Sequence, residues 1–264
     1  MNVKRFSIAV AISAIVSSSI AAQAPAGSVR RTADGKPDIS GVWQTGGISL
    51  AGTQANVVPA QAPAAPAPGA APAGRGAPPT GEYAALPTQP SLQPWADEKV
   101  KTLTNKDDPT VSCLLPGVPR IITMPMPFEI VQTPKQVVIL YEAFRAFRII
   151  PTDGRKQPGE SLPSFMGDST GHWEGDTLVV DVKNFNGKIW GPGNMRVTSE
   201  ALHVIERYTP SGNTVAYEAK IEDPKVLTGP FVFRTTLQRP PETRVAEYEC
   251  LENNVDLPHL VGPG

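Results

Sequence analysis

The sequence lacks an excess of either charge. Its 264 residues carry 24 Lys and Arg against 25 Asp and Glu, and the basic residues are scattered along the chain. Proteins that bind nucleic acid concentrate positive charge in a patch or along one helix, and helices that lie on membranes are amphipathic and basic. The sequence has neither feature and therefore predicts no nucleic-acid partner.

Long apolar runs are also missing after the first two dozen residues, so we expect no membrane span in the mature chain. Residues 1–24 have the organisation of a secretory signal: Lys4 and Arg5 begin it, residues 6–20 are apolar and small, and small residues suit cleavage near Ala24. An uncleaved anchor is the weaker alternative, because the apolar run is short. The predicted location is periplasmic or secreted.

Motifs that bind cofactors are absent as well. The sequence contains no Walker phosphate loop and no dinucleotide fingerprint, so any enzyme here would work without an organic cofactor. A metal site built from His172, Asp168 and Asp176 is an alternative, but no HxH or HExxH spacing supports it. We expect neither a cofactor nor a metal.

Cysteine is scarce, with Cys113 and Cys250 as the only two. An isolated pair in an oxidising compartment usually forms a disulfide, which here would tie an entry loop to the last expected strand. A nucleophilic cysteine would need a neighbouring base and positive surroundings, which the sequence does not show. The pattern predicts a structural disulfide.

Residues 25–264 are expected to form one domain with an Ala/Pro/Gly-rich insert at 55–82. The insert has too few large apolar residues to build a core, so it is predicted to be a disordered loop. A partner-binding arm is the alternative interpretation. The prolines between Cys113 and Ile130 predict an ordered loop over the domain, and Leu92–Leu103 is the one convincing helix.

From Gln136 onward, short alternating segments follow one another, separated by turns that carry Gly, Pro, Asn or Ser. Leu202, Val204 and Tyr208 fall on one face of their segment, as expected for a half-buried strand. The predicted strands are, in order, QVVILYE, AFRAFRII, the hairpin at 167–187, ALHVIERY, TVAYEAKI, FVFRTTLQ and RVAEYECLE. Antiparallel hairpins without helices between them indicate a meander, which closes into a barrel or folds into a sandwich.

The stretch from Gly167 to Gly187 is predicted to be a tight hairpin. Its turn is Trp173-Glu174-Gly175-Asp176, in which glycine can adopt the positive φ that such turns require. The same stretch gathers one of three histidines, one of four tryptophans and several acids. Any chemistry is therefore expected here or across from it.

The segments GHWEGDTLVVDVKNFN, SEALHVIERY and YEAKIEDP, with SGVW and CLLPGVPR upstream, resemble a large group of secreted bacterial proteins with GHWEGDTLVVDT-type signatures. The resemblance covers most of the chain outside the signal and the insert. It implies an all-β fold, an antiparallel meander closing into a lipocalin-like, calycin-type barrel. It transfers no catalytic residues, and residues 156–158 (KQP) depart from a segment in which similar proteins often carry a histidine.

His172 is the first candidate for acid–base chemistry, since imidazole titrates near neutrality and Asp168 lies close in sequence. Alternatively, His172 only hydrogen-bonds the hairpin turn. Glu206 shares strand parity with Leu202, Val204 and Tyr208, so it would face the barrel interior. It would act there as an acid or base, or form a salt bridge with an interior arginine such as Arg148 or Arg234. Glu218 and Arg207 have the opposite parity and are expected to form a solvated pair.

Three functions are compatible with these residues. The first is a barrel that binds a small apolar or aromatic molecule, stacked on Trp173, Phe185, Trp190 and Tyr208. The second is a cofactor-independent lyase, isomerase or hydrolase that uses His172 and Glu206. The third is an envelope interaction protein. A location of His172 and Glu206 in one cavity would favour the second.

Overall fold

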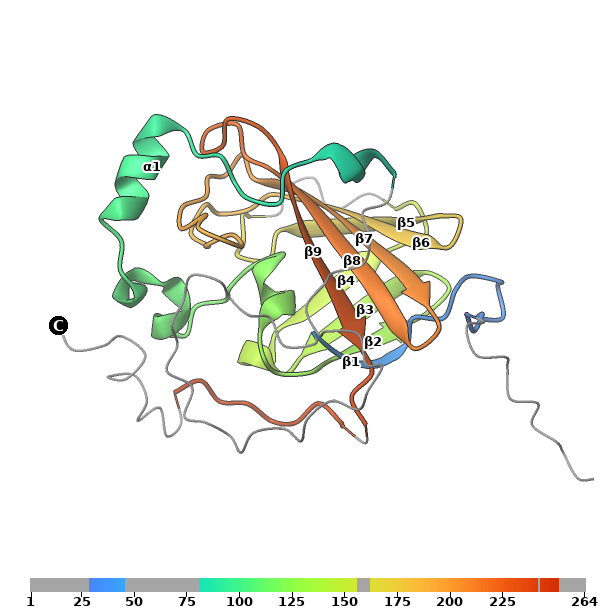
Figure 1. The fold of residues 1–264 in the computed structure, drawn as a ribbon. Coiled ribbons are helices and arrows are strands. Elements are labelled where there is room, and N and C mark those ends of the chain that lie inside the picture. The colour runs from blue at the N-terminus through green and yellow to red at the C-terminus, as the bar shows by residue number, and fades with distance from the viewer. Residues whose placement is uncertain (1–28, 46–80, 156–161, 242, 252–264) are drawn as a thin grey trace, which may run out of the picture.

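A computed structural model describes residues 29–45, 81–155, 162–241 and 243–251 (Figure 1). The predicted signal and most of the predicted insert lie outside these residues. The nine strands are β1 (Gly41–Thr45), β2 (Phe128–Gln132), β3 (Gln136–Tyr141), β4 (Phe147–Pro151), β5 (Asp168–Glu174), β6 (Thr177–Lys183), β7 (His203–Ser211), β8 (Thr214–Glu222) and β9 (Phe231–Gln238).

All nine strands form one antiparallel sheet in the order β4-β3-β2-β1-β9-β8-β7-β6-β5. Two meanders, β2 to β4 and β5 to β9, are joined by β1, which pairs with β2 on one side and β9 on the other. The two edge strands of the sheet are β4 and β5, which follow one another in the chain. The sheet therefore opens between two consecutive strands.

The sheet curls until its two edge strands, β4 and β5, lie against each other. A Cβ added at Gly171 of β5 would lie 2.9 Å from Ile150 Cγ2 and 3.2 Å from Thr152 Cγ2. The fold is thus an all-β, nearly closed barrel, as predicted for a lipocalin-like chain, and its strands surround an apolar core (Figure 1).

The hairpin at the start of the second meander agrees with the prediction. β5 and β6 pair from Asp168–Lys183 to Glu174–Thr177, which leaves Gly175 and Asp176 as a two-residue turn. Gly175 has φ of 57°, a left-handed value that glycine adopts at little cost. The short turn fixes the register and so decides which β5 residues face inward.

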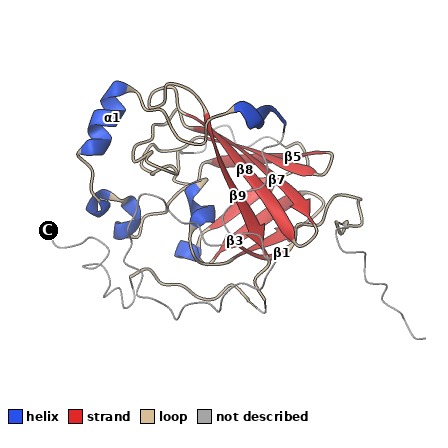
Figure 2. Cartoon of the chain, in the orientation of Figure 1, coloured by secondary structure: helices blue, strands red, loops and turns tan. Residues whose placement is uncertain are grey.

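The helical segments lie outside the strands (Figure 2). α1 (Pro94–Lys101) confirms the predicted helix, with proline in its first turn and Lys99 and Lys101 in its last. Five 3₁₀ helices accompany it: η1 (Gly81–Ala85), η2 (Asn105–Asp107), η3 (Pro109–Ser112), η4 (Arg120–Thr123) and η5 (Ala143–Arg145). In the described ranges, no helix is long and apolar enough to cross a membrane.

The predicted loop from Cys113 to Ile130 is only partly correct. Its last residues, Phe128–Ile130, belong to β2, which lies inside the sheet between β1 and β3. The prolines end at Pro127, so every β2 residue has an N–H that can join the ladder. The alternating burial of Phe128 and Ile130 then matches a strand with one face toward the core.

The strand predicted for RVAEYECLE is wrong. Residues 243–251 form no strand, and side chains rather than a ladder hold this segment. Glu142 accepts a hydrogen bond from the Ala246 N–H at 2.8 Å, and the ring of Tyr248 packs on Phe144 at 5.9 Å. The alternation of apolar and polar residues imitates a strand, but β9 already has β1 as its second neighbour.

The predicted disulfide is present. Cys113 and Cys250 are bonded, with their Cα atoms 5.8 Å apart across a sequence separation of 137 residues. The bond fixes the segment after β9 to the end of η3. It fits a compartment outside the cytoplasm, where such bonds persist.

Candidate functional site

A buried ion pair crosses the interior of the barrel. Glu206 on β7 alternates with buried Val204 and Tyr208, so strand parity turns its carboxylate inward, as predicted. Arg148 on β4 reaches it with two hydrogen bonds, from Nη1 to Oε1 at 3.1 Å and from Nη2 to Oε2 at 2.6 Å. The side chains of the pair are only 3% and 1% exposed, so a polar centre lies within an otherwise apolar core.

Three neighbouring hydroxyls complete this centre. The hydroxyls of Tyr208 and Tyr217 each donate to Glu206 Oε1 at 2.9 Å, and Arg148 Nη2 also donates to Ser169 Oγ at 2.8 Å. The rings of the two tyrosines meet edge to face at 5.0 Å. Glu206 therefore accepts four hydrogen bonds, the kind of satisfaction that a buried charge requires.

The electrostatics of the centre keep its donors protonated. Burial raises the pKa values of Tyr208 and Tyr217 well above the ordinary range, and the Glu206 carboxylate raises them further. For Arg148, burial opposes the charged form, but the charge of Glu206, the neighbouring tyrosines Tyr141 and Tyr208 and the hydrogen bond to Glu206 together outweigh it and raise the pKa. Arg148 thus stays a cation, and the tyrosines stay hydrogen-bond donors.

Two polar atoms of the same region have no hydrogen-bond partner among the described residues, namely the Tyr141 hydroxyl and Arg148 Nε. Tyr141 lies on β3 and is 3% exposed. Burial raises the pKa of Tyr141 to about 12, with the charge of Arg148 acting in the opposite direction. Most buried polar groups in proteins are bonded, so two unpaired donors in one region are a distinctive feature of this interior.

Among the described residues, the ladder between β1 and β9 is short and does not reach Phe233. In the described part of the sheet, β1 pairs with β9 only at Gln238 and Leu237. Beside the first half of β9, opposite β8, lies the segment after η1, where the Pro87 carbonyl accepts a hydrogen bond from the Val232 N–H at 2.8 Å. Phe233 has the parity of buried Phe231 and Thr235, yet it is partly exposed. Its ring lies 6.2 Å from that of Tyr217. Aromatic contacts therefore lead from this part of the sheet to the polar centre.

His172, Asp168 and Glu206 are not brought together. His172 points outward from β5 with a 60% exposed side chain, and its Nε2 lies 3.1 Å from Glu174 Oε1. Asp168 accepts a hydrogen bond from Asn184 at 2.8 Å. Glu206 lies on the opposite, inner face of the sheet. The arrangement that would favour an acid–base pair of His172 and Glu206 is thus not found.

The four predicted ligand-binding aromatics divide into two groups. Trp173 lies opposite Leu178, and Leu178 lies opposite Tyr208, so Trp173 and Tyr208 share the inward face. Phe185 is fully buried just after β6. Trp190 follows in the same loop, where Arg120 and Arg196 lie over its ring at 5.8 and 5.2 Å. Only the first pair lines the barrel.

The predicted solvated pair of Glu218 and Arg207 is wrong. The two residues are opposite each other on β8 and β7, but Glu218 is only 4% exposed and binds Arg234 Nε at 2.9 Å. Arg207 instead binds Glu174 at 2.8 Å. This outer face is not solvated because η1 covers it. Tyr83 of η1 is buried there, and the guanidinium of Arg207 lies over the Tyr83 ring.

Serine hydrolases carry a G-x-S-x-G pattern that the segment 167–171, GDSTG, fits by sequence. In those enzymes the serine lies on a sharp turn from a strand into a helix. Ser169 lies inside β5, is 4% exposed and accepts a hydrogen bond from Arg148. The pattern therefore does not form a nucleophile elbow, and Ser169 belongs to the polar centre.

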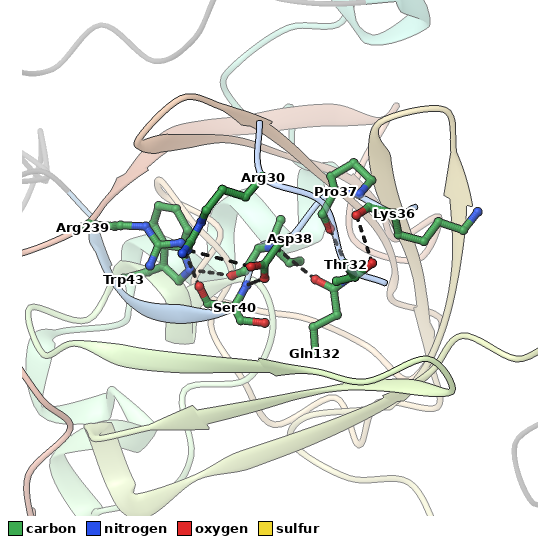
Figure 3. A network of polar contacts seen from close by, with 10 residues as sticks. Arg30, Thr32, Lys36, Pro37, Asp38, Ser40, Trp43, Gln132 and Arg239 are labelled. Carbon is green, nitrogen blue, oxygen red and sulfur yellow. Dashed lines mark hydrogen bonds and ion pairs between the residues drawn. The ribbon is translucent and has the colours of Figure 1, made fainter. Parts of the chain in front are cut away.

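A second network of polar contacts lies around the start of β1 (Figure 3). Arg239, directly after β9, lies over the ring of Trp43 at 4.2 Å and donates to the Ser40 carbonyl at 2.8 Å. The Gln132 side chain donates to the Pro37 carbonyl and accepts from the Ile39 N–H. These bonds hold the segment before β1 to β2 and to the residue that follows β9. Trp43 is a buried core residue here.

The residues of a metal site are not assembled. Among the residues that the structure describes, no three His, Cys, Asp or Glu side chains are grouped so that they could hold a metal ion. Asp176, one of the three residues of the alternative metal site, forms an ion pair with Arg31 at 3.0 Å.

Fold and site together define a class, a nearly closed β-barrel with a buried ionic centre. No protein-family model, no curated protein and no solved structure matches the chain.

Proposed function

We propose that this protein is a binding barrel that takes a small apolar or aromatic molecule into its interior. Barrels of about this size either fill their interior with side chains or enclose one small ligand among them. Ligand sites in proteins are mainly apolar and aromatic, with a few placed polar groups. The interior described above has this composition, with Phe233, Tyr217 and Tyr208 beside the ionic centre.

The observation that carries this proposal is the exposure of Phe233. An inward-facing aromatic side chain that is partly exposed, beyond the end of the β1–β9 ladder, gives an apolar molecule a surface to contact on its way in. The polar centre behind it would fix the orientation of the molecule. Trp173 supports the same function, since it also faces inward and is only partly buried.

A periplasmic or secreted location is part of the proposal. The Cys113–Cys250 disulfide supports it, because such bonds are rare in the cytosol. The resemblance to secreted proteins with GHWEGDTLVVDT-type signatures supports it as well. The enzyme alternative has less support, since His172 and Glu206 lie on opposite faces of the sheet.

The test is a thermal-shift titration of the purified protein with 2-ethylnaphthalene and 2-acetylnaphthalene. A ligand that binds only the folded state raises the melting temperature in a concentration-dependent way. We expect such a rise, and we expect Phe233→Ala to weaken binding at least about threefold, because part of the contact surface is removed.

Phe147→Ala is the matched control. Phe147 is an apolar side chain on the outer face of β4 and is 64% exposed. Its removal should leave the titration unchanged. If Phe147→Ala abolishes the shift and Phe233→Ala does not, the compounds bind the outer surface and the proposal is wrong. No shift with either compound also contradicts it.

A further inference from the structure

The two unpaired donors in the barrel interior point to the polar group of the ligand. We infer that Arg148 Nε and the Tyr141 hydroxyl both donate hydrogen bonds to one uncharged oxygen atom of the bound molecule. Such an oxygen belongs to a ketone, aldehyde, ester or amide carbonyl. The inference rests on the proposed binding function and goes beyond it, because it names the chemical class of the ligand.

The positions of the two donors come from the β3–β4 ladder. Arg148 lies opposite Ile139, and Tyr141 lies two residues further along β3 on the same face. Such diagonal neighbours are about 7–8 Å apart at Cα, within reach of long side chains. Neither donor has a partner among the described residues, so one acceptor placed between them would satisfy both.

In this structure no described protein atom accepts a hydrogen bond from either donor, and the Tyr141 hydroxyl oxygen, which lies beside Arg148, is not bonded to its Nε. Arg148 Nη1 and Nη2 already donate hydrogen bonds to Glu206 and Ser169. The Glu206 carboxylate also accepts hydrogen bonds from the hydroxyls of Tyr208 and Tyr217. The Nε–H can only donate, because a guanidinium has no acceptor. The high pKa of Tyr141, about 12, keeps its proton on the hydroxyl. A carbonyl oxygen, with two lone pairs, fits two converging donors.

The charge of the centre excludes an acidic ligand. Arg148 and Glu206 neutralise each other in an almost fully buried pair. A carboxylate beside Arg148 Nε would add one uncompensated negative charge to this interior, next to Glu206, and burial of such a charge is strongly unfavourable. A neutral carbonyl completes the hydrogen bonds without adding charge.

The experiment compares three compounds of similar shape: 2-ethylnaphthalene, 2-acetylnaphthalene and 2-naphthoate. Dissociation constants are measured by calorimetry or tryptophan fluorescence at neutral pH. The ketone should bind about tenfold more tightly than the hydrocarbon, since it gains two hydrogen bonds, and the carboxylate should bind more weakly than the ketone.

Tyr141→Phe separates this role from a structural one. The variant should reduce the preference for the ketone over the hydrocarbon to about threefold and leave the affinity for the hydrocarbon unchanged. Without compound, it should melt no lower than the native protein, because the hydroxyl has no protein partner to lose. Tyr83→Phe, which removes the hydroxyl of a buried tyrosine on the outer face, should change neither preference nor binding.

The possible outcomes distinguish the carbonyl site from the binding function itself. Equal binding of ketone and hydrocarbon, with the Phe233 dependence intact, leaves the binding barrel standing and overturns the carbonyl site. A lower melting temperature of Tyr141→Phe with an unchanged preference shows that the hydroxyl binds structural solvent, which also overturns it. Binding of none of the three compounds overturns the proposed function, and this inference with it.

Discussion

The ion pair of Arg148 on β4 and Glu206 on β7 ties four strands together through the core, since Ser169 on β5 and Tyr217 on β8 share its hydrogen bonds. Glu206→Gln leaves the guanidinium buried without a counter-charge. We expect a loss of about 3–5 kcal/mol in the free energy of unfolding, measured by urea denaturation.

The double variant Arg148→Met/Glu206→Gln tests the cause of that loss. Its interior holds no charge, and the amide that replaces the Glu206 carboxylate still offers an oxygen to the hydroxyls of Tyr208 and Tyr217. We therefore expect it to be more stable than Glu206→Gln alone. Additive losses from the two single changes would show that the pair is not coupled.

The bridge between Asp108 and Arg120 makes stability depend on pH. Burial favours the protonated carboxyl, but the hydrogen bonds and charge of Arg120 outweigh it and lower the pKa of Asp108 below its ordinary value near 3.8. A lowered pKa means that the stabilisation is complete above about pH 3.8 and disappears as pH falls through the folded-state value.

Asp108→Asn should therefore cost about 1–3 kcal/mol at neutral pH, and the difference from the native protein should shrink as the pH falls below about 3.8 and through the lowered folded-state pKa. Urea denaturation at several pH values measures this. In an Arg120→Met background, the same substitution should have little effect at any pH. A difference that persists in acid would assign the loss to packing.

At single positions, strand parity predicted the inward direction of Glu206, and one of the two arginines named as its partner, Arg148, is the observed one. Tyr141 shares parity with Val137 and Ile139, so its inward direction was also readable. Its position beside Arg148 was not readable, because it depends on the register between β3 and β4. Parity fixes a face, whereas a site needs several strands in register.

The elements show the same division between local and tertiary causes. The hairpin at 175–176 and the helix at 94–101 follow from glycine and proline at fixed positions. Residues 243–251 alternate like a strand but pair with none, since only the barrel decides which edges remain open. Their attachment depends on side chains and on the disulfide.

The Cys113→Ser/Cys250→Ser variant tests that attachment. The bond closes a loop of 137 residues, so its loss should lower the free energy of unfolding by about 4–5 kcal/mol in the chain-entropy model. The far-ultraviolet circular dichroism should stay that of the native barrel, because the described part of the released segment contributes no strand. Reductant should affect the native protein in the same way and the variant not at all.

On the scale of the whole molecule, the sequence predicted a meander that forms a barrel or a sandwich, and the family resemblance favoured the barrel. The opening of the sheet between β4 and β5 could not be read from the sequence, since β1 joins the two meanders through long-range pairing. Closure there depends on how near the two edge strands can come to each other.

Gly171 controls that approach. A Cβ at this position would lie 2.9 Å from Ile150 and 3.2 Å from Thr152 on the opposite edge, with no positive φ to complicate the substitution. We expect Gly171→Ala to cost about 1–3 kcal/mol, because the crowded edges must move apart. Gly229→Ala is the matched control: it also has no positive φ and would meet nothing within 4 Å, so its effect should stay within about 0.5 kcal/mol.

Equal effects of the two variants, measured by urea denaturation, would mean that the edges are free to separate. The barrel would then behave as an open sheet, and the interior centre would be accessible along β4.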